Sequence, residues 1–113
     1  MSEFNELMEA VAKFRDERDW AQFHNEKDLA ISIALESAEL LELFQWKTPE
    51  QAVERNMTRL EEELADVLLY CFMLSDKIGV YPARIMKEKL LKNDEKYPVS
   101  KAFGKSDKYT ELD

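Results

Sequence analysis

The sequence predicts an all-α protein built as a four-helix bundle. The 113 residues include only 2 Gly and 3 Pro, while 45% are hydrophobic and 35% are charged, a composition typical of long helices rather than turn-rich sheets. Apolar residues recur at helical spacing in four segments joined by short connections. We therefore expect one helical domain over residues 1–98 and a polar tail over residues 99–113.

The first half of the chain contains two of these segments. A first helix is expected over residues 3–18, where Leu7 and Val11 lie on one apolar stripe. The helical period is then interrupted by a short aromatic connection. Asp28 is a suitable N-cap for a second helix, which is expected to run to about Trp46.

The second half of the chain contains the other two helical segments. Thr58 and Glu61 match the capping-box pattern, so a third helix is expected to begin there and to end at Gly79, a typical C-terminal stop. Pro82 suits the first turn of a fourth helix, which should end before Tyr97 because a proline follows that residue.

Charge and composition argue against some classes of binding partner and indicate the compartment. The formal net charge of -8 argues against a nucleic-acid backbone or an anionic membrane, since either would be repelled. Cys71, the only cysteine, lies in an apolar run and is predicted to be a small buried hydrophobe. The first residues lack a signal-peptide pattern, and no apolar stretch approaches the roughly 20 residues of a membrane span. The expected compartment is the cytoplasm.

Four carboxylates fall on or beside core-facing stripes. At 100° per residue, Glu36 lies within the apolar stripe of its helix with Glu39 at the edge, and Glu63 lies within the stripe of the next helix with Asp66 beside it. An ionised carboxylate removed from water needs a compensating partner. Because all four ligands are oxygens, the sequence predicts a site for Mg²⁺, with Mn²⁺ as a possible substitute.

Two rival interpretations of the acidic residues are weaker. A single E-x-x-E pattern is most often a solvated surface pair, and Glu42, Glu61 and Glu62, which fall away from the stripes, fit that description. Two pairs in phase with apolar stripes on adjacent helices favour a metal site. A di-iron bundle would normally need Glu-x-x-His on two helices, and His24 is in no such motif.

Aromatic residues could receive a nucleotide base. Trp46 lies seven residues beyond Glu39, on nearly the same helical line, so its ring would stand about two turns from the acidic site. Trp20 and His24 lie in the connection between the first two helices, where loops often supply ligand contacts. A lone tryptophan is more often a core or interface residue.

A basic line in the last helix could meet phosphates. Lys89, Asn93 and Lys96 recur at i, i+4 and i+7, a spacing suited to phosphate oxygens. A solvated helix face gives the same pattern, and lysine is mostly exposed.

Several motifs together carry a family resemblance. They are Glu17-Arg18-Asp19-Trp20 with Phe23-His24, Glu36-Ser37-Ala38-Glu39-Leu40, Glu42-Leu43-Phe44-Gln45-Trp46-Lys47, Glu62-Glu63-Leu64-Ala65-Asp66-Val67-Leu68-Leu69-Tyr70, Lys89 with Asn93, Lys96-Tyr97-Pro98 and Lys108-Tyr109-Thr110-Glu111-Leu112. In these motifs the chain resembles the MazG-like all-helical nucleoside triphosphate pyrophosphohydrolases, most closely the dCTP pyrophosphatase branch.

The resemblance implies a mechanism and a set of site residues. The domain would be a MazG-like bundle assembled as a dimer or a dimer of dimers, cleaving dCTP or modified dCTP to the monophosphate and pyrophosphate and so cleansing the nucleotide pool. The metal and catalytic residues would be Glu36, Glu39, Glu63 and Asp66. The substrate-binding residues would be Trp20 and Trp46 around the base, His24 and Tyr70 at sugar or base, and Lys89, Asn93, Lys96 and Tyr97 at the triphosphate.

Two alternatives stay open at this point. The first is the same chemistry on dUTP or on a broad set of nucleoside triphosphates, because base-pocket contacts decide this preference and sequence shows them poorly. The second is a non-catalytic helical interaction module that uses the aromatic patch to bind a partner. Retention of all four carboxylates argues against the module.

Overall fold

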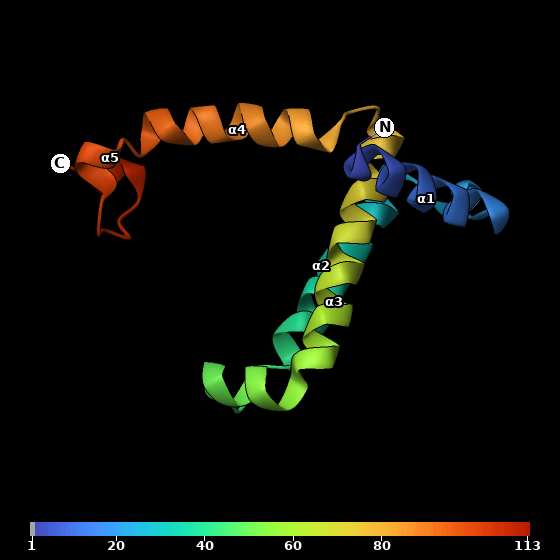
Figure 1. The fold of residues 1–113 in the computed structure, drawn as a ribbon, viewed down its shortest axis with the longest axis horizontal. Helices are drawn as coiled ribbons and strands as arrows, with labels where there is room; N and C mark the ends of the chain where they lie inside the picture. Colours follow the sequence, from blue (N-terminus) through green and yellow to red (C-terminus); the bar gives the residue numbers. More distant parts are fainter. Residues whose placement is uncertain (1) are drawn as a thin grey trace. The chain divides into compact units, whose positions relative to one another are not determined.

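The computed structural model describes residues 2–113, which form helices and no strand, so the all-α prediction is confirmed (Figure 1). The chain divides into two compact units, one up to Gly79 and one from Val80 to Asp113. The first unit contains α1 (Glu3–Glu17), the 3₁₀ helix η1 (Trp20–Phe23), α2 (Glu26–Glu42) and α3 (Pro49–Ile78). The second contains α4 (Pro82–Lys96), α5 (Val99–Ala102) and the 3₁₀ helix η2 (Tyr109–Glu111). Across the described residues, no helix has the length and apolar character that crossing a membrane requires.

Helix α1 agrees with its prediction to within one residue. It begins where the Ser2 hydroxyl accepts a hydrogen bond from the Asn5 backbone N–H at 3.1 Å. After α1 ends, Asp19 adopts a left-handed backbone conformation with φ of 52°, which an aspartate tolerates better than most residues. This residue redirects the chain into η1.

Helix α2 begins earlier and ends earlier than expected. Its N-cap is Asn25, whose side-chain oxygen accepts from the Asp28 backbone N–H at 2.7 Å, so the predicted cap at Asp28 is wrong. The predicted end at about Trp46 is also wrong, because the helix stops at Glu42 and the next residues form turns. Trp46 itself has φ of 63°, a conformation outside any right-handed helix.

Helix α3 begins nine residues before the predicted start at Thr58. The capping box is formed by Thr48 and Gln51, with Gln51 N–H donating to Thr48 Oγ1 at 3.2 Å and Thr48 N–H donating to Gln51 Oε1 at 3.0 Å. Pro49 occupies the first helical position, where its missing N–H has no consequence. The C-terminal stop at Gly79 is confirmed, with φ of 77°.

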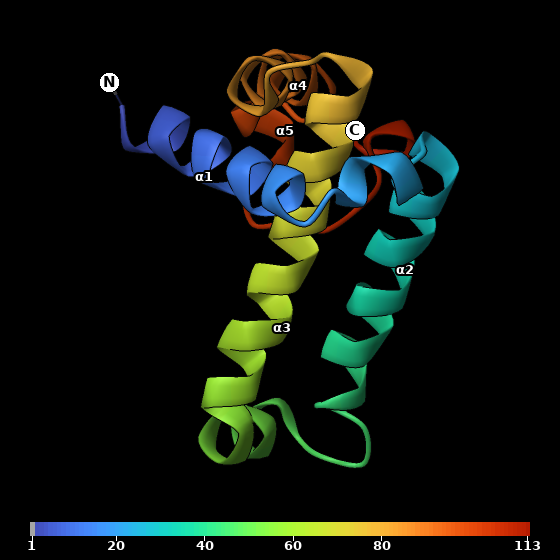
Figure 2. The ribbon, with the colours of Figure 1, turned by 90° about the vertical axis from the view of Figure 1, so that its right-hand side faces the viewer.

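A kink near the start of α3 ties this helix to α2. Asn56 departs from helical geometry with φ of -122° and ψ of 21°, and its side-chain amide donates to the Leu43 carbonyl at 3.1 Å. This bond satisfies a carbonyl left free at the end of α2. The two helices lie side by side as an antiparallel hairpin (Figure 2).

The core of the first unit lies where α1 meets this hairpin. Val11, Leu29 and Met73 are buried together, and the side chains packed against them are Leu69, Tyr70, Phe72 and Leu74. The Arg15 guanidinium donates to an Asp76 carboxylate oxygen at 2.6 Å and so links α1 to the end of α3. Cys71 is half-buried, and burial raises the pKa of its thiol.

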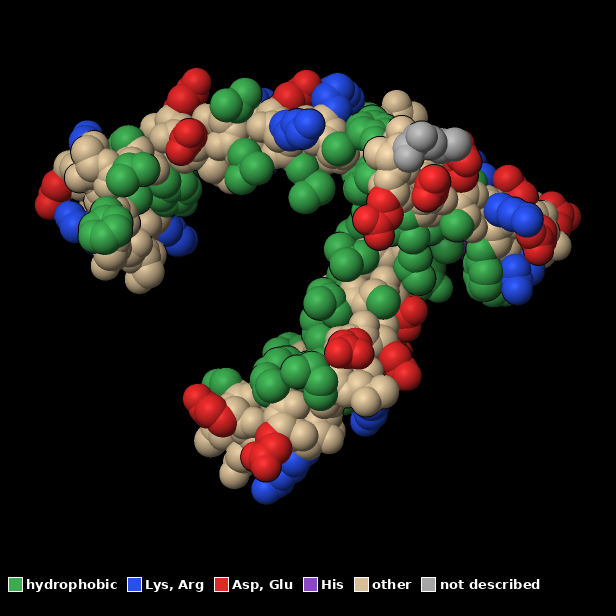
Figure 3. Space-filling view, in the orientation of Figure 1, with side chains coloured by type: hydrophobic (Ala, Val, Ile, Leu, Met, Phe, Trp, Pro, Cys, Tyr) green, Lys and Arg blue, Asp and Glu red, His purple; other side chains and the backbone are tan. Residues whose placement is uncertain are grey.

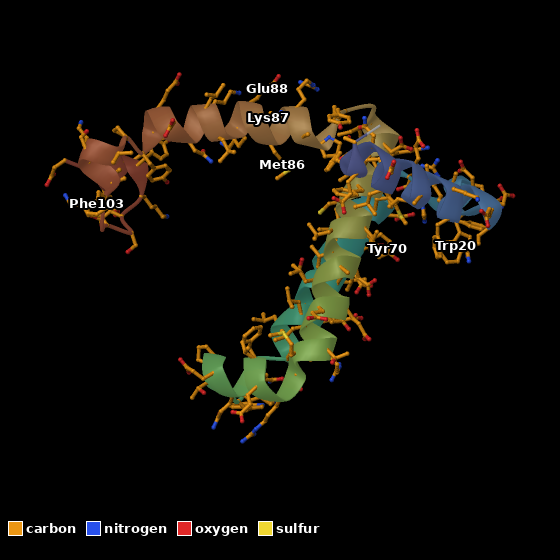
Figure 4. The ribbon with its side chains drawn as sticks, viewed as in Figure 1. Trp20, Tyr70, Met86, Lys87, Glu88 and Phe103 are labelled. Atoms are coloured by element: carbon orange, nitrogen blue, oxygen red, sulfur yellow. The ribbon has the colours of Figure 1, made fainter. Side chains whose placement is uncertain are left out.

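The second unit consists of the predicted fourth helix and of residues 99–113, the expected polar tail, which contain two short helices. Helix α4 begins at Pro82 and ends before Tyr97, as predicted. Met86 and Glu88 project from opposite sides of it (Figure 4). Beyond it, α5 and η2 are separated by a reversal at Gly104, whose φ of 74° suits glycine.

Many large apolar side chains of the hairpin remain exposed (Figure 3). On α3 they recur at helical spacing along one stripe, and on α2 three more are exposed, so we define the apolar stripe as Ile31, Leu35, Leu41, Val53, Met57, Leu64 and Leu68. Exposed apolar side chains in this number on two paired helices are typical of an interaction surface.

Candidate active site

Helices α2 and α3 bring three of the predicted metal ligands together. One carboxylate oxygen from each of Glu36, Glu39 and Glu63 lies within 4.8 Å of the others. Glu36 and Glu63 are half-buried, while Glu39 is exposed. Asp66 is exposed and lies outside this group of three, one helical turn after Glu63. Residues separated by 27 positions in sequence thus meet because the hairpin aligns their helices.

The electrostatics of this cluster are those of crowded carboxylates. The pKa of Glu36 is raised to about 7, first by burial, then by a hydrogen bond with Glu39 and by the negative charges of Glu39, Asp66 and Glu63. Burial likewise raises the pKa of Glu63, with Glu39 and Asp66 contributing. Asp66 therefore acts on both half-buried carboxylates through its charge.

The cluster fits a hard divalent cation. Glu36 Oε2 and Glu63 Oε2 are buried and have no hydrogen-bond partner within residues 2–113, an arrangement that is unfavourable for carboxylates unless a ligand completes it. The donor set consists of carboxylate oxygens alone, which suits Mg²⁺ or Mn²⁺. A cation bound there would satisfy the two oxygens and remove the mutual repulsion.

Two of the predicted aromatic residues, Trp20 and Tyr70, lie in the same unit. Trp20 is 41% exposed and packs edge-to-face on Phe14, with ring centroids 5.6 Å apart. Tyr70 projects from the C-terminal third of α3 (Figure 4) and packs against the core cluster. These contacts fix the two rings, and the 41% exposure of the indole leaves part of it free to meet a ligand.

His24 closes η1 and is half-buried. Its Nδ1 atom is buried without a hydrogen-bond partner in the described part of the chain. Burial lowers the pKa of the imidazole, and the positive charges of Arg15 and Lys77 lower it further. The ring is therefore neutral at neutral pH, so one of its two nitrogens can accept a hydrogen bond.

Trp46 is not on the helical line expected for it, because α2 ends at Glu42. Its side chain is 92% exposed and its backbone is in the left-handed region, which costs a bulky residue about 1–3 kcal/mol. A pocket of about 510 Å³ is lined by the residues that precede it, Ala38, Leu41, Glu42, Phe44 and Gln45. No contact within the hairpin explains the strained, exposed indole.

The predicted phosphate-binding residues all lie in the second unit. Lys89 and Asn93 share one face of α4, where with Met86 and Leu90 they line a hollow of about 250 Å³. Lys96 and Tyr97 lie at the end of α4, and both contact the ring of Tyr109. Their placement beside the carboxylates of the first unit stays a prediction.

The sequence did not single out Arg15. Its guanidinium donates hydrogen bonds to Asp16 at 2.8 Å and to Asp76 at 2.6 Å. Its positive charge also lowers the pKa of His24. Because Asp76 lies 61 residues away in sequence, no local pattern could pair them.

Comparisons with known proteins find related sequences and a related fold. The MazG-like family model matches residues 31–112. The chain is 41% identical over 106 residues to dCTP pyrophosphatase 1 of Homo sapiens and 39% identical to that of Rattus norvegicus, covering 89% of this chain and 62% of each relative. The chain therefore spans about 62% of the length of these relatives. The crystal structure of a pyrophosphatase from Archaeoglobus fulgidus superposes with a TM-score of 0.82 at 41% identity, covering 87% of this chain and 94% of that one.

Proposed function

This chain belongs to the MazG-like family, and from that premise we propose that it is a Mg²⁺-dependent nucleoside triphosphate pyrophosphohydrolase acting on dCTP or a base-modified dCTP. The observation that carries the proposal is the carboxylate cluster with two buried, unpartnered oxygens among the described residues. The relatives named dCTP pyrophosphatase 1 and the structurally similar pyrophosphatase support the reaction class.

In this proposal the carboxylates divide between holding metal and orienting water. Glu36, Glu39, Glu63 and Asp66 are the proposed ligands of Mg²⁺, three of them within reach of one ion, and Mn²⁺ is a chemically acceptable substitute. When bound, the cation supplies Lewis-acid polarisation of the phosphate and neutralises the leaving pyrophosphate. Either Glu36 or Glu39 orients the attacking water and accepts its proton, so no covalent intermediate with the protein is needed.

The remaining predicted residues recognise the nucleotide. The exposed, strained indole of Trp46 supports a role in stacking on the base, together with Trp20. The neutral imidazole of His24 and the hydroxyl of Tyr70 contact sugar or base. The triphosphate is held by Lys89, Asn93, Lys96 and Tyr97.

We further propose that the chain assembles as a dimer or a dimer of dimers, with sites completed between protomers. The apolar stripe supports this, since Leu41, Leu64 and Leu68 are at least 50% exposed and a second copy of the hairpin would cover them. Two hairpins packed in this way would also form a four-helix bundle.

The test is a pyrophosphate-release assay on a panel of canonical and modified nucleotides, with Mg²⁺ and with EDTA. We expect release from dCTP only with metal, and a loss of at least about 100-fold in kcat for Glu63→Gln, the scale expected when one charge-stabilising group is removed. Glu62→Gln is the matched control, because Glu62 is the adjacent acidic residue and is exposed.

Three outcomes would revise the proposal. Hydrolysis without metal, or full activity in Glu63→Gln, would contradict the mechanism. Faster release from dUTP or equal release from many triphosphates would replace the substrate while keeping the chemistry. No release from any nucleotide would favour a helical interaction module.

A further inference from the structure

The second unit differs from the first in charge. Residues 80–113 contain eight Lys and Arg against six Asp and Glu, a net charge of +2 in a chain whose total is -8. The first unit therefore carries -10. A cationic segment in an acidic protein is suited to an anionic ligand such as a polyphosphate.

The ring of Tyr109 contacts two residues at the end of α4. The Lys96 ammonium nitrogen lies 4.8 Å from the ring centroid, within the range of a cation–π interaction. The Tyr97 ring meets the Tyr109 ring edge-to-face, with centroids 6.1 Å apart and an interplanar angle of 78°. Residues 96 and 97 are thus held by one side chain that follows them by a dozen positions.

Two turns of the backbone bring Tyr109 back to the end of α4. Gly104 reverses the direction after α5 with φ of 74°, a conformation that a residue with a Cβ rarely adopts. The η2 turn that follows is closed by a hydrogen bond from the Glu111 N–H to the Lys108 carbonyl at 2.8 Å. Leu112 is half-buried at the end of this turn.

Holding Lys96 by an aromatic ring preserves its charge. Within residues 2–113 this lysine forms no ion pair with a carboxylate. A carboxylate partner would compete with phosphate for the ammonium, whereas a neutral ring fixes the flexible side chain and leaves its charge available. A lysine fixed before the ligand arrives loses less conformational entropy on binding.

We propose that Tyr109 is a positioning residue for triphosphate binding, fixing the Lys96 ammonium and the Tyr97 ring in the orientation that receives the phosphates. The proposal rests on the proposed function, since it presumes that these two residues bind the triphosphate. It gives the C-terminal segment a role in substrate binding rather than in the chemical step.

The test compares steady-state kinetics on dCTP with Mg²⁺. For Tyr109→Leu, which removes the ring and keeps an apolar side chain, we expect KM to rise about two- to fivefold with kcat within about twofold. Tyr109→Phe keeps the ring face and should retain the original KM. Phe103→Leu is the matched control, because Phe103 is an aromatic residue of the same segment that is 86% exposed.

A double-mutant cycle tests whether Tyr109 acts through Lys96. If it does, Tyr109→Leu will raise the KM of Lys96→Met by a smaller factor than it raises the KM of wild type, the remainder acting through Tyr97, and fully additive effects would overturn the proposal. An unchanged KM in Tyr109→Leu, or a fall in kcat alone, would also overturn it while leaving the proposed function standing. Absence of hydrolysis by the wild-type chain would overturn the proposed function and this inference with it.

Discussion

Two carboxylates of the hairpin, Glu36 and Glu63, should make the free energy of unfolding depend on pH. In the folded chain the pKa of Glu36 is about 7 against an ordinary value of 4.5, and that of Glu63 is raised as well. Between these pH values the folded state binds more protons than the unfolded state. The contribution of Glu36 to the free energy of unfolding is therefore complete below about pH 4.5 and is lost as the pH rises through about 7.

We predict from this that Mg²⁺ stabilises the protein much more at about pH 8 than at about pH 5, because the carboxylates must be ionised to bind it. The measurement is Tm by calorimetry at both pH values, with EDTA and with Mg²⁺. Glu36→Gln should reduce the metal-dependent rise and flatten the metal-free pH dependence relative to wild type. An equal Mg²⁺ effect at both pH values would contradict the prediction.

At Trp46, stability and activity should respond in opposite directions. Replacing Trp46 by Gly relieves the left-handed backbone, so we expect the free energy of unfolding to be unchanged or up to about 1 kcal/mol higher. Loss of the stacking ring should lower kcat/KM about 5- to 150-fold, the range for one base–aromatic stack.

Trp46→Ala separates the two effects, because it removes the same ring without relieving the backbone. Urea unfolding and steady-state kinetics on dCTP measure both quantities. Undiminished kcat/KM in either variant would remove Trp46 from the substrate site.

Helix caps provide a prediction at the scale of the element. Thr48→Ala should lower the free energy of unfolding by about 1 kcal/mol, because it removes the oxygen that accepts the Gln51 N–H. Thr58→Ala, which lies within α3 and is exposed, should change it by less than about 0.5 kcal/mol. Urea titrations of both variants compare them directly, and equal losses would contradict the assigned cap.

Some helix boundaries follow from the local sequence, whereas other features of the helices depend on tertiary contacts. Gly79 and Pro82 mark a stop and a start that need only the residue's own backbone preference, and both were predicted correctly. The capping pattern occurs twice within α3 and its cap, at Thr48 and at Thr58, and local sequence alone did not choose between them. The kink at Asn56 depends on a bond to the Leu43 carbonyl, a tertiary contact outside any helical period.

The candidate site also contains residues that the local sequence predicts and residues that it does not. Glu36 and Glu63 could be found from sequence, because the helical period places each among the core-facing apolar residues of its helix. The conformation of Trp46 could not, since it depends on where α2 stops and on a turn with a positive φ. The contact of Arg15 with Asp76 likewise depends on the packing of α1 against α3.

For the whole molecule, the apolar stripe predicts self-association. Leu64→Glu places a charge on the exposed stripe of α3, so we expect the dissociation constant of the dimer to rise at least about tenfold, corresponding to about 1.4 kcal/mol. Glu62→Lys is the control, because Glu62 lies on the opposite side of the helix and also changes charge. Sedimentation velocity over a concentration series measures both, and a wild-type chain that stays monomeric throughout would contradict the prediction.

The short connection over residues 43–48 sets the order of events during folding. Helices joined by so few residues meet after a small loss of loop-closure entropy, and folds dominated by such local contacts form within microseconds to milliseconds. Pairing of α2 with α3 would therefore precede the slower, concentration-dependent encounter that the proposed dimer requires. Glu36 and Glu63 would come together in that first step, so the proposed cation site would form within a single chain before any association.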